Sequence, residues 1–356
     1  MTREEYLREQ IEAHNRRFQQ LKLRQARQGV NTEPSVVTEI EDIEAMLETL
    51  QSELEAVGGT VPPAFHSLSA RAQLHQIVLY WAEDGRKTSF SHVDLSGADL
   101  KTVELSGAKL NVANLSQADL RMSNLSQADL RFANLRGANL RQADLRNADL
   151  RGADLLQADL GKADLREADL REATLEKADG GKADLRWAKL SEAKLGQCKL
   201  RQADLRWADL GEADLSNADL KEADLREAGM ERANLAQTKL HESRLESANL
   251  YQANLEEAKL EKAKLREVCL AEANLRRVNL RGVSLYRADL HGANLQGADL
   301  FRAYLNEANL QGANLSGANC AGVNLGDADL SGVIYDRDTT WPATFDPVEA
   351  GTILVA

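Results

Sequence analysis

The sequence predicts a solenoid, and three observations support this prediction. A five-residue phrase of the type Ala-Asp/Asn-Leu-x-x repeats from residue 95 to residue 330 without insertion or deletion. All 48 residue numbers divisible by five in this range are Leu, except Gly180, Met230 and Cys320. The residue two places before each of them is Ala or another small residue. Such a short fixed repeat indicates units that bury their apolar residues only by stacking on their neighbours.

This run resembles the pentapeptide-repeat family, with units of the ANLSQ and ADLRE type. The resemblance implies a mainly β fold, a right-handed quadrilateral parallel β-helix with an N-terminal helical hairpin and a capping helix added here. Four pentapeptides would form the sides of a 20-residue coil, with the Leu and the small residue pointing inward. The 48 units would give 12 coils and a rod of roughly 55 to 60 Å. The aromatic residues of the run agree, because all occupy outward positions: Phe132, Trp187, Trp207, Tyr251, Tyr286, Phe301 and Tyr304.

Residues 1–57 are expected to form a helical hairpin, because apolar residues recur at alternating three- and four-residue steps on both sides of Pro34. Residues 21–54 resemble helical-hairpin modules of bacterial signalling and conflict-system proteins, which implies association rather than catalysis. The apolar seam from Val36 to Val57 exceeds what one short partner helix can cover. We therefore expect a homodimer through residues 1–57; the alternative is that the hairpin folds back along the rod as a cap.

The remaining boundaries follow from where the repeat begins and ends. Residues 58–66 are interpreted as a linker and 67–85 as an amphipathic helix that covers the first coil, with a partner site as the alternative. The β-helix is assigned to residues 86–335 and a C-terminal cap to 336–356, in which Trp341 and Phe345 cover the last Leu layer. All five prolines lie outside the repeat, as a continuous hydrogen-bonded ladder requires.

Composition and spacing argue against several classes of protein. No apolar stretch approaches the ~20 residues of a membrane span, and the charged N-terminus does not resemble a secretory signal. We expect a cytoplasmic location and no membrane association. Cys198, Cys269 and Cys320 are too far apart in the repeat to form a disulfide or a metal site. The six histidines show no metal-ligand spacing.

We expect no catalytic residue, no cofactor and no metal, because an interior packed with Leu and Ala leaves no polar pocket. The function that remains is a non-enzymatic protein-binding scaffold or adaptor. The main alternative, implied by the family resemblance, is an acidic mimic of duplex DNA that binds DNA gyrase; a carbohydrate-active β-helix enzyme is a more distant one. The charges of the run nearly balance, whereas B-DNA carries one charge per ~1.7 Å. We therefore favour the scaffold and expect no direct nucleic-acid binding.

The candidate contact surface is built from a repeated Asp-Leu-Arg-x phrase. One column of Asp and one of Arg run beside each other over five coils and are expected to pair across coils. Two phrases end in Trp, one coil apart, so their indoles should stack about 5 Å apart. The stack is interpreted either as a contact site or as a device that only stabilises neighbouring coils. The surface comprises Trp187, Trp207, Arg166, Arg186, Arg206, Arg226, Asp184 and Asp204.

Gly180 and Cys320 are expected to mark places where the core is less well filled, because each replaces a Leu. They are 140 residues apart and therefore share one side of the rod. At Gly180 a Leu is missing between Leu160 and Leu200, so either a backbone shift fills the gap or a small void remains.

Overall fold

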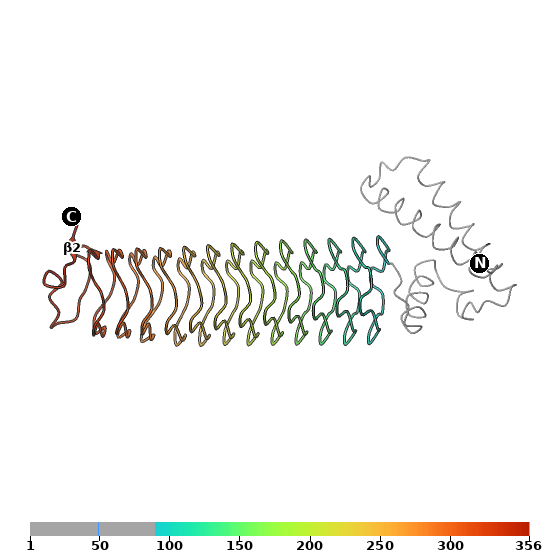
Figure 1. Ribbon diagram of the computed structural model, residues 1–356, viewed down its shortest axis with the longest axis horizontal. Coiled ribbons are helices and arrows are strands. Elements are labelled where there is room, and N and C mark those ends of the chain that lie inside the picture. Colours follow the sequence, from blue (N-terminus) through green and yellow to red (C-terminus); the bar gives the residue numbers. More distant parts are fainter. Residues whose placement is uncertain (1–48, 50–89, 356) are drawn as a thin grey trace, which may run out of the picture.

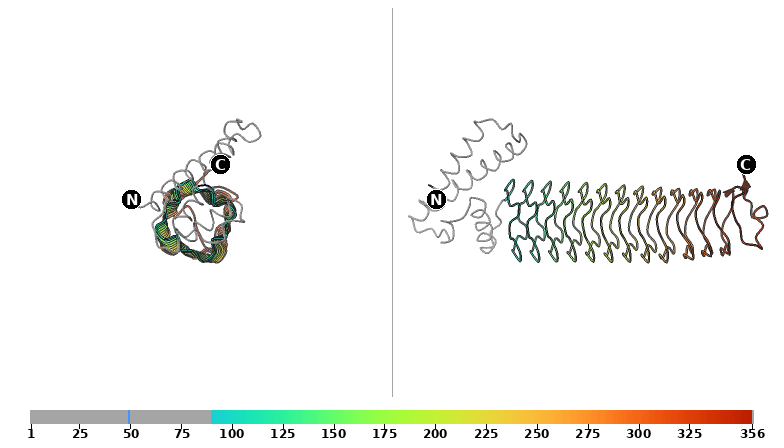
Figure 2. Two further views of the ribbon diagram at one scale, coloured as in Figure 1. Left: turned by 90° about the vertical axis from the view of Figure 1, so that its right-hand side faces the viewer. Right: turned by 180° about the vertical axis from the view of Figure 1, so that it is seen from behind.

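The computed structural model describes residue 49 and residues 90–355. From residue 90 the chain winds into a straight rod of stacked coils (Figure 1), and seen along the axis the coils lie directly over one another (Figure 2). The C-terminal residues fold against the far end of the rod. The helices expected in residues 1–57 and 67–85 and the linker at 58–66 fall outside the described residues, Thr49 excepted.

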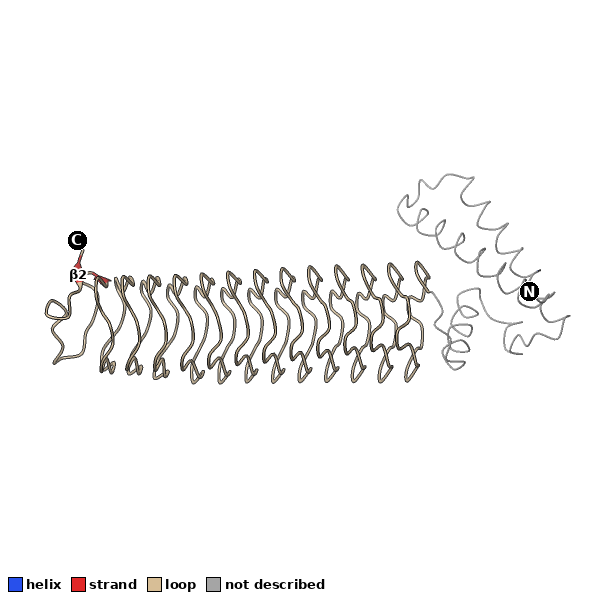
Figure 3. Ribbon diagram, viewed as in Figure 1, coloured by secondary structure: helices blue, strands red, loops and turns tan. Residues whose placement is uncertain are grey.

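Residues 20 apart in the sequence lie side by side in neighbouring coils. Parallel bridges join Asp94 to Asn114 and continue in steps of five residues, always 20 residues apart, as far as the pair Asn314 and Ile334. The next bridge, from Asn319 to Thr340, spans 21 residues. Each side of a coil contributes one bridging residue between two turns, so the rod consists of isolated bridges rather than of continuous strands (Figure 3).

The Leu column and the column of small residues fill the inside of the rod. Leu residues at positions divisible by five are almost all fully buried, and Met230 is buried in the same way. Hydroxyl groups in the small column are hydrogen-bonded: Ser123 Oγ donates to Leu120 O at 2.7 Å, and Ser243 Oγ donates to Leu240 O at 2.7 Å. Because each buried hydroxyl has a partner, these polar residues do not interrupt the core.

The corners of the coil are tight turns that hold non-glycine residues at positive φ. At one corner the N–H of Ala188 donates to Leu185 O at 3.0 Å, and Trp187 has a φ of 56°. Positive φ at the third position alone defines a type II turn, which usually takes Gly or Asn there. Most corners instead carry Glu, Gln, Lys or Trp. The N–H of Trp187 also donates to Arg206 O of the next coil at 3.1 Å, so the ladder holds the strained residue in place.

Two short strands and an aromatic group close the C-terminal end. Strand β1 (Ile334–Tyr335) pairs in parallel with β2 (Ile353–Leu354), which the sequence did not lead us to expect. Trp341 lies edge-on to Tyr335, with ring centroids 5.7 Å apart, and 5.0 Å from Phe345. Both Trp341 and Phe345 pack against the buried cluster of the rod, so this segment covers the last layer of the core.

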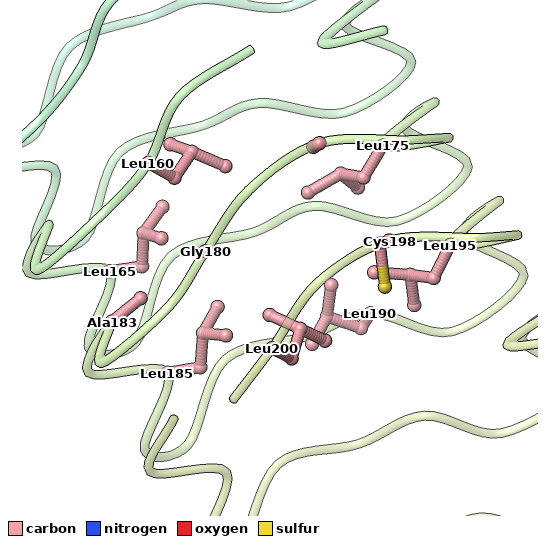
Figure 4. Close-up of a pocket in the computed structure, with 11 residues that line it drawn as sticks. Leu160, Leu165, Leu175, Gly180, Ala183, Leu185, Leu190, Leu195, Cys198 and Leu200 are labelled. Carbon is pink, nitrogen blue, oxygen red and sulfur yellow. The ribbon is translucent and has the colours of Figure 1, made fainter. Parts of the chain in front are cut away.

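Gly180 leaves a small void rather than shifting the backbone (Figure 4). The void measures about 10 Å³ and is lined by Leu and Ala side chains and by Cys198. The ladder continues without a break, because the N–H of Gly180 donates to Lys199 O at 2.7 Å. A Cβ atom at Gly180 would lie 2.8 Å from Leu200 Cδ2, so Leu200 already occupies part of the space. Cys320, on the same side of the rod, is buried.

Candidate protein-contact surface

Five Asp-Leu-Arg phrases on one side of the rod share one local structure. In the phrase at 184–186, Asp184 Oδ1 accepts the backbone N–H of Arg186 at 3.3 Å and its Nε–H at 2.8 Å, while Arg186 Nη2 donates to Asp184 Oδ2 at 2.6 Å. The carboxylate therefore fixes the corner and the guanidinium together, through a bidentate charge-assisted contact. The same arrangement joins Asp144 to Arg146, Asp164 to Arg166, Asp204 to Arg206 and Asp224 to Arg226.

The expected pairing across coils exists only as a second, longer contact. Arg186 Nε lies 3.6 Å from Asp204 Oδ2 of the next coil, and Arg166 Nε lies 3.6 Å from Asp184 Oδ2. The primary partner of each Arg is the Asp two residues earlier in its own phrase. The predicted pairing across coils is therefore present, but as the longer of the two contacts. The Asp and Arg of one phrase are only two residues apart, whereas the next coil is a full strand spacing away.

Pairing neutralises the charges of these phrases at the surface. The hydrogen bond from Arg146 holds the pKa of the Asp144 carboxyl below its usual value, and the same bond raises the pKa of Arg146. The pKa of Arg186 is raised by its hydrogen bond to Asp184, and that of Arg206 by its bond to Asp204. A partner that approaches this side therefore meets paired guanidinium and carboxylate groups rather than a row of free charges.

The paired columns end where the two charges exchange places. Arg244 occupies the Asp column and Glu246 the Arg column. Arg244 Nη1 still lies 3.5 Å from Asp224 Oδ2, and Arg244 Nε lies 3.7 Å from Glu246 Oε1. The exchange of Asp for Arg and of Arg for Glu can be read from the sequence. Its effect on the ion pairs is known only from the side-chain contacts in the structure.

Trp187 and Trp207 form an exposed stack beside the paired columns. Their ring centroids are 4.7 Å apart and their planes are inclined by 7°, so the predicted spacing of one coil is confirmed. The side chains are 45% and 36% exposed. The guanidinium carbons of Arg186 and Arg206 lie 5.7 Å and 5.3 Å from the respective ring centroids, within the range of a cation–π contact. The stack and the Arg–Asp pairs thus form one continuous surface.

Glu167 and Glu227 bound the stack at its two ends. They occupy the same corner position as the two Trp residues, one coil before and one coil after them, with φ values of 59° and 57°. Both are exposed. Across residues 90–355, neither side chain makes a hydrogen bond or ion pair. Among the described residues, the two carboxylates are therefore unpaired, beside Arg and Asp side chains that pair with each other.

A second feature, not identified from the sequence, is a hollow on the neighbouring side of the rod. It is an open depression of about 380 Å³ lined by Ser191, Glu192, Gly211, Glu212, Glu231, Arg232 and Tyr251. The small residues Ser191 and Gly211 leave it open, and three Glu carboxylates line it. A column-by-column reading of the sequence would have revealed these neighbours, since each lies one or two coils from the next.

Charge is divided between two opposite sides of the rod. One side consists of the five-residue units centred on Leu100, Leu120 and each twentieth residue onward, and these units contain 13 basic and 9 acidic residues. The opposite side consists of the units centred on Leu110, Leu130 and each twentieth residue onward. These units contain 6 basic and 11 acidic residues and include the acidic hollow. The near balance of the whole run therefore conceals a charge difference across the rod.

The described part of the chain offers no arrangement suited to metal chemistry. It contains no group of three or more His, Cys, Asp or Glu placed to hold a metal ion. Burial raises the pKa of the Cys198 and Cys320 thiols to about 12, which makes them poor nucleophiles. In residues 90–355 and at residue 49, we find no helix with the length and hydropathy of a membrane span.

A rod of five-residue units with a 20-residue coil defines a β-helical repeat protein. The family model for pentapeptide repeats matches eight copies, in segments between residues 86 and 332. The chain belongs to the pentapeptide-repeat family. Members of this family form right-handed β-helices and are generally non-catalytic structural or binding proteins. No curated protein matches the chain significantly.

Solved structures of other pentapeptide-repeat proteins are similar to this chain. HetL, involved in heterocyst differentiation regulation in the cyanobacterium Nostoc sp. strain PCC 7120, is 37% identical; the match covers 72% of this chain and 95% of HetL, with a TM-score of 0.42. Rfr23 from the cyanobacterium Cyanothece 51142 is 44% identical over 29% of this chain and 63% of its own, with a TM-score of 0.16. QnrB1, a plasmid-mediated fluoroquinolone resistance protein, is 16% identical over 58% and 91%, with a TM-score of 0.35.

Proposed function

We propose that this chain is a non-enzymatic protein-binding scaffold. In this proposal a rod of 12 coils presents the surface around Trp187 and Trp207 to a partner protein. The N-terminal residues 1–57 hold two copies together or dock the rod to a signalling partner.

The observation that carries the proposal is the exposed stack of Trp187 and Trp207, 4.7 Å apart and bordered by Arg186 and Arg206. Trp and Arg are the residue types most enriched among the residues that dominate binding energy at interfaces. These side chains are also held in place before any partner arrives, because each Arg is tied to an Asp of its own coil. Side chains that are already ordered lose less conformational entropy on binding.

A purely structural role for the stack is the competing interpretation. Two indoles in contact stabilise neighbouring coils by about 0.5 to 1.5 kcal/mol beyond the area they bury. The stack also covers only two coils, which is small against the ~800 Å² that each partner contributes to a standard interface. The contact surface therefore has to extend over the neighbouring Arg–Asp pairs Asp184–Arg186 and Asp204–Arg206 and beyond them.

A gyrase-binding DNA mimic is the second candidate, and the charge distribution argues against it. Duplex DNA is negatively charged all round, with one charge per ~1.7 Å. One side of this rod has more basic than acidic residues, and the Asp column from Asp144 to Asp224 is neutralised by bidentate Arg partners. Charge mimicry would require these carboxylates to be free.

The test of the proposed function is affinity capture with a Trp187→Ala/Trp207→Ala double variant. Partners retained by the full chain should be lost by the double variant, while its circular dichroism spectrum remains that of the full chain. A matched control is Phe132→Ala/Met122→Ala, which removes two exposed apolar side chains from other sides of the rod. If the double Trp variant captures the same partners and only its melting temperature falls, the stack is structural and the proposal fails.

A further inference from the structure

We propose that the strip formed by Glu167, Trp187, Trp207 and Glu227 binds an extended basic segment of a partner protein. This inference rests on the proposed function and names the chemistry of its partner. Two cationic heads would pair with Glu167 and Glu227, and the side chain between them would lie against the exposed indole edges.

The four residues form one straight strip because they share one position in four successive coils. Their φ values are 59°, 56°, 58° and 57° in chain order, so the four backbones present their side chains in the same direction. The two inner members stack at 4.7 Å. At about 4.8 Å per coil, the two carboxylates lie three coils, or roughly 14 Å, apart.

The charges of the strip favour a cationic partner. Each Arg beside it is already paired with an Asp of its own phrase, as Arg186 is with Asp184 at 2.6 Å. The carboxylates of Glu167 and Glu227 have no such partner among the described residues. Within the described part of the chain, the strip therefore offers two unpaired negative charges, which repel a phosphate backbone and attract Lys or Arg. Long basic side chains can also lay their aliphatic stems against indole.

The distance between the carboxylates selects the conformation of the segment. Alternate residues of an extended chain point the same way and are separated by about 6.8 Å. Residues at positions i and i+4 are then about 13 to 14 Å apart, which matches the distance between Glu167 and Glu227. A helix rises only about 1.5 Å per residue and would need about nine residues to span the same distance. An extended segment makes the same two contacts with five residues.

The first experiment uses two synthetic peptides of equal composition with the full-length protein. One peptide contains Lys-Ala-Leu-Ala-Lys, with Lys at i and i+4, and the other contains Lys-Lys-Ala-Leu-Ala. Binding is followed through Trp fluorescence at low ionic strength. We expect the first peptide to bind at least about tenfold more tightly, a difference of ~1.4 kcal/mol. Equal affinities for the two peptides, or preferential binding of a thymidine decamer, would overturn the inference.

The second experiment removes only the two charges. Glu167→Gln/Glu227→Gln should abolish the preference for the spaced peptide without changing the melting temperature. The matched control is Glu172→Gln/Glu192→Gln, which removes two exposed carboxylates from the same corner position on another side of the rod. The control should bind as the full chain does. A Gln variant at 167 and 227 that keeps its preference contradicts the inference.

The two proposals fail in different ways. If Glu167→Gln/Glu227→Gln still captures the natural partner but Trp187→Ala/Trp207→Ala does not, the partner is not basic and only the further inference is wrong. If the double Trp variant also captures the partner, the proposed function itself is wrong.

Discussion

The side chain of Leu200 extends into the space beside Gly180, so that a Cβ atom at residue 180 would lie only 2.8 Å from Leu200 Cδ2. The gap left by the missing Leu is thereby reduced to a void of about 10 Å³. The backbone at Gly180 is not in the left-handed region, so a larger side chain meets steric rather than conformational resistance. That resistance comes from the movable end of one side chain.

Gly180→Leu should raise the melting temperature. The new side chain would restore the column between Leu160 and Leu200, provided that the end of the Leu200 side chain moves away from residue 180. Filling the void and burying the added groups should stabilise the rod by about 1 kcal/mol or more. Thermal unfolding followed by circular dichroism measures the effect.

Gly180→Ala is the control for this prediction. It reduces the conformational freedom of the unfolded chain, which is worth about 0.4 to 1 kcal/mol, but it adds only one methyl group. Leu should therefore stabilise more than Ala. A melting temperature lower than that of the unchanged chain for Gly180→Leu would mean that Leu200 cannot withdraw and that the column is closed to a further side chain.

Acid should weaken the rod through its Asp–Arg pairs. Hydrogen bonds from Arg121, Arg131 and Arg146 lower the folded-state pKa of Asp119, Asp129 and Asp144. A carboxyl with a lowered folded pKa stabilises the fold above its unfolded pKa, about 3.9, and this contribution is lost as the pH falls through the folded value. We expect the urea midpoint to decrease below about pH 4 and to be nearly constant above it, where these carboxyls are ionised in both states.

Asp144→Asn provides the matched variant for the acid prediction. Asn134 occupies the equivalent position of its own five-residue unit, and its Oδ1 accepts the N–H of Arg136 at 3.2 Å. The corner at residue 144 should therefore keep its side-chain-to-backbone hydrogen bond. The variant should be less stable than the unchanged chain at pH 7 and should depend less on pH below 4. An unchanged pH profile would show that the pair with Arg146 contributes no net free energy, as happens for many exposed ion pairs.

DNA supercoiling by gyrase should be unaffected at micromolar protein. The Asp column is neutralised by Arg, and one side of the rod has an excess of basic residues, so the rod lacks the continuous negative field of duplex DNA. A supercoiling assay with purified gyrase measures this directly. Inhibition at low micromolar concentration would favour the DNA-mimic alternative over the scaffold.

Residues 1–57 should hold the protein as a dimer. The apolar seam from Val36 to Val57 needs a larger apolar partner than the first helix of a hairpin can provide. Light scattering should give twice the monomer mass for the full chain and the monomer mass for a shortened chain that begins at Val61. Monomeric masses for both would favour the alternative in which the hairpin folds back on the rod.

The spacing of residues along the chain determined most of the rod. A repeat of five without insertion places every Leu at the same position of its unit, and the 20-residue coil that the family resemblance implies puts Trp187 and Trp207, 20 residues apart, on neighbouring coils. The types of residue at the corners did not predict the positive φ that they adopt. Glu, Gln and Lys do not favour positive φ by themselves, and they adopt it here because bonds such as Trp187 N to Arg206 O link each corner to the next coil.

By itself, the sequence determined which residues share a position in the five-residue unit, because that position depends only on residue number. Which of them share a column followed from the 20-residue coil that the family resemblance implies. The sequence could not determine which side chains within neighbouring columns bond to each other. Arg186 can reach both Asp184 and Asp204, at 2.6 and 3.6 Å, and only the tertiary geometry favours the first. The same holds for Leu200, whose Cδ2 lies 2.8 Å from where a Cβ atom of residue 180 would stand, in keeping with a closely packed interior. It also holds for β2, whose pairing with β1 depends on where the cap returns the chain to the end of the rod. Periodicity fixes positions along and around a solenoid, whereas side-chain reach and packing decide the contacts made there.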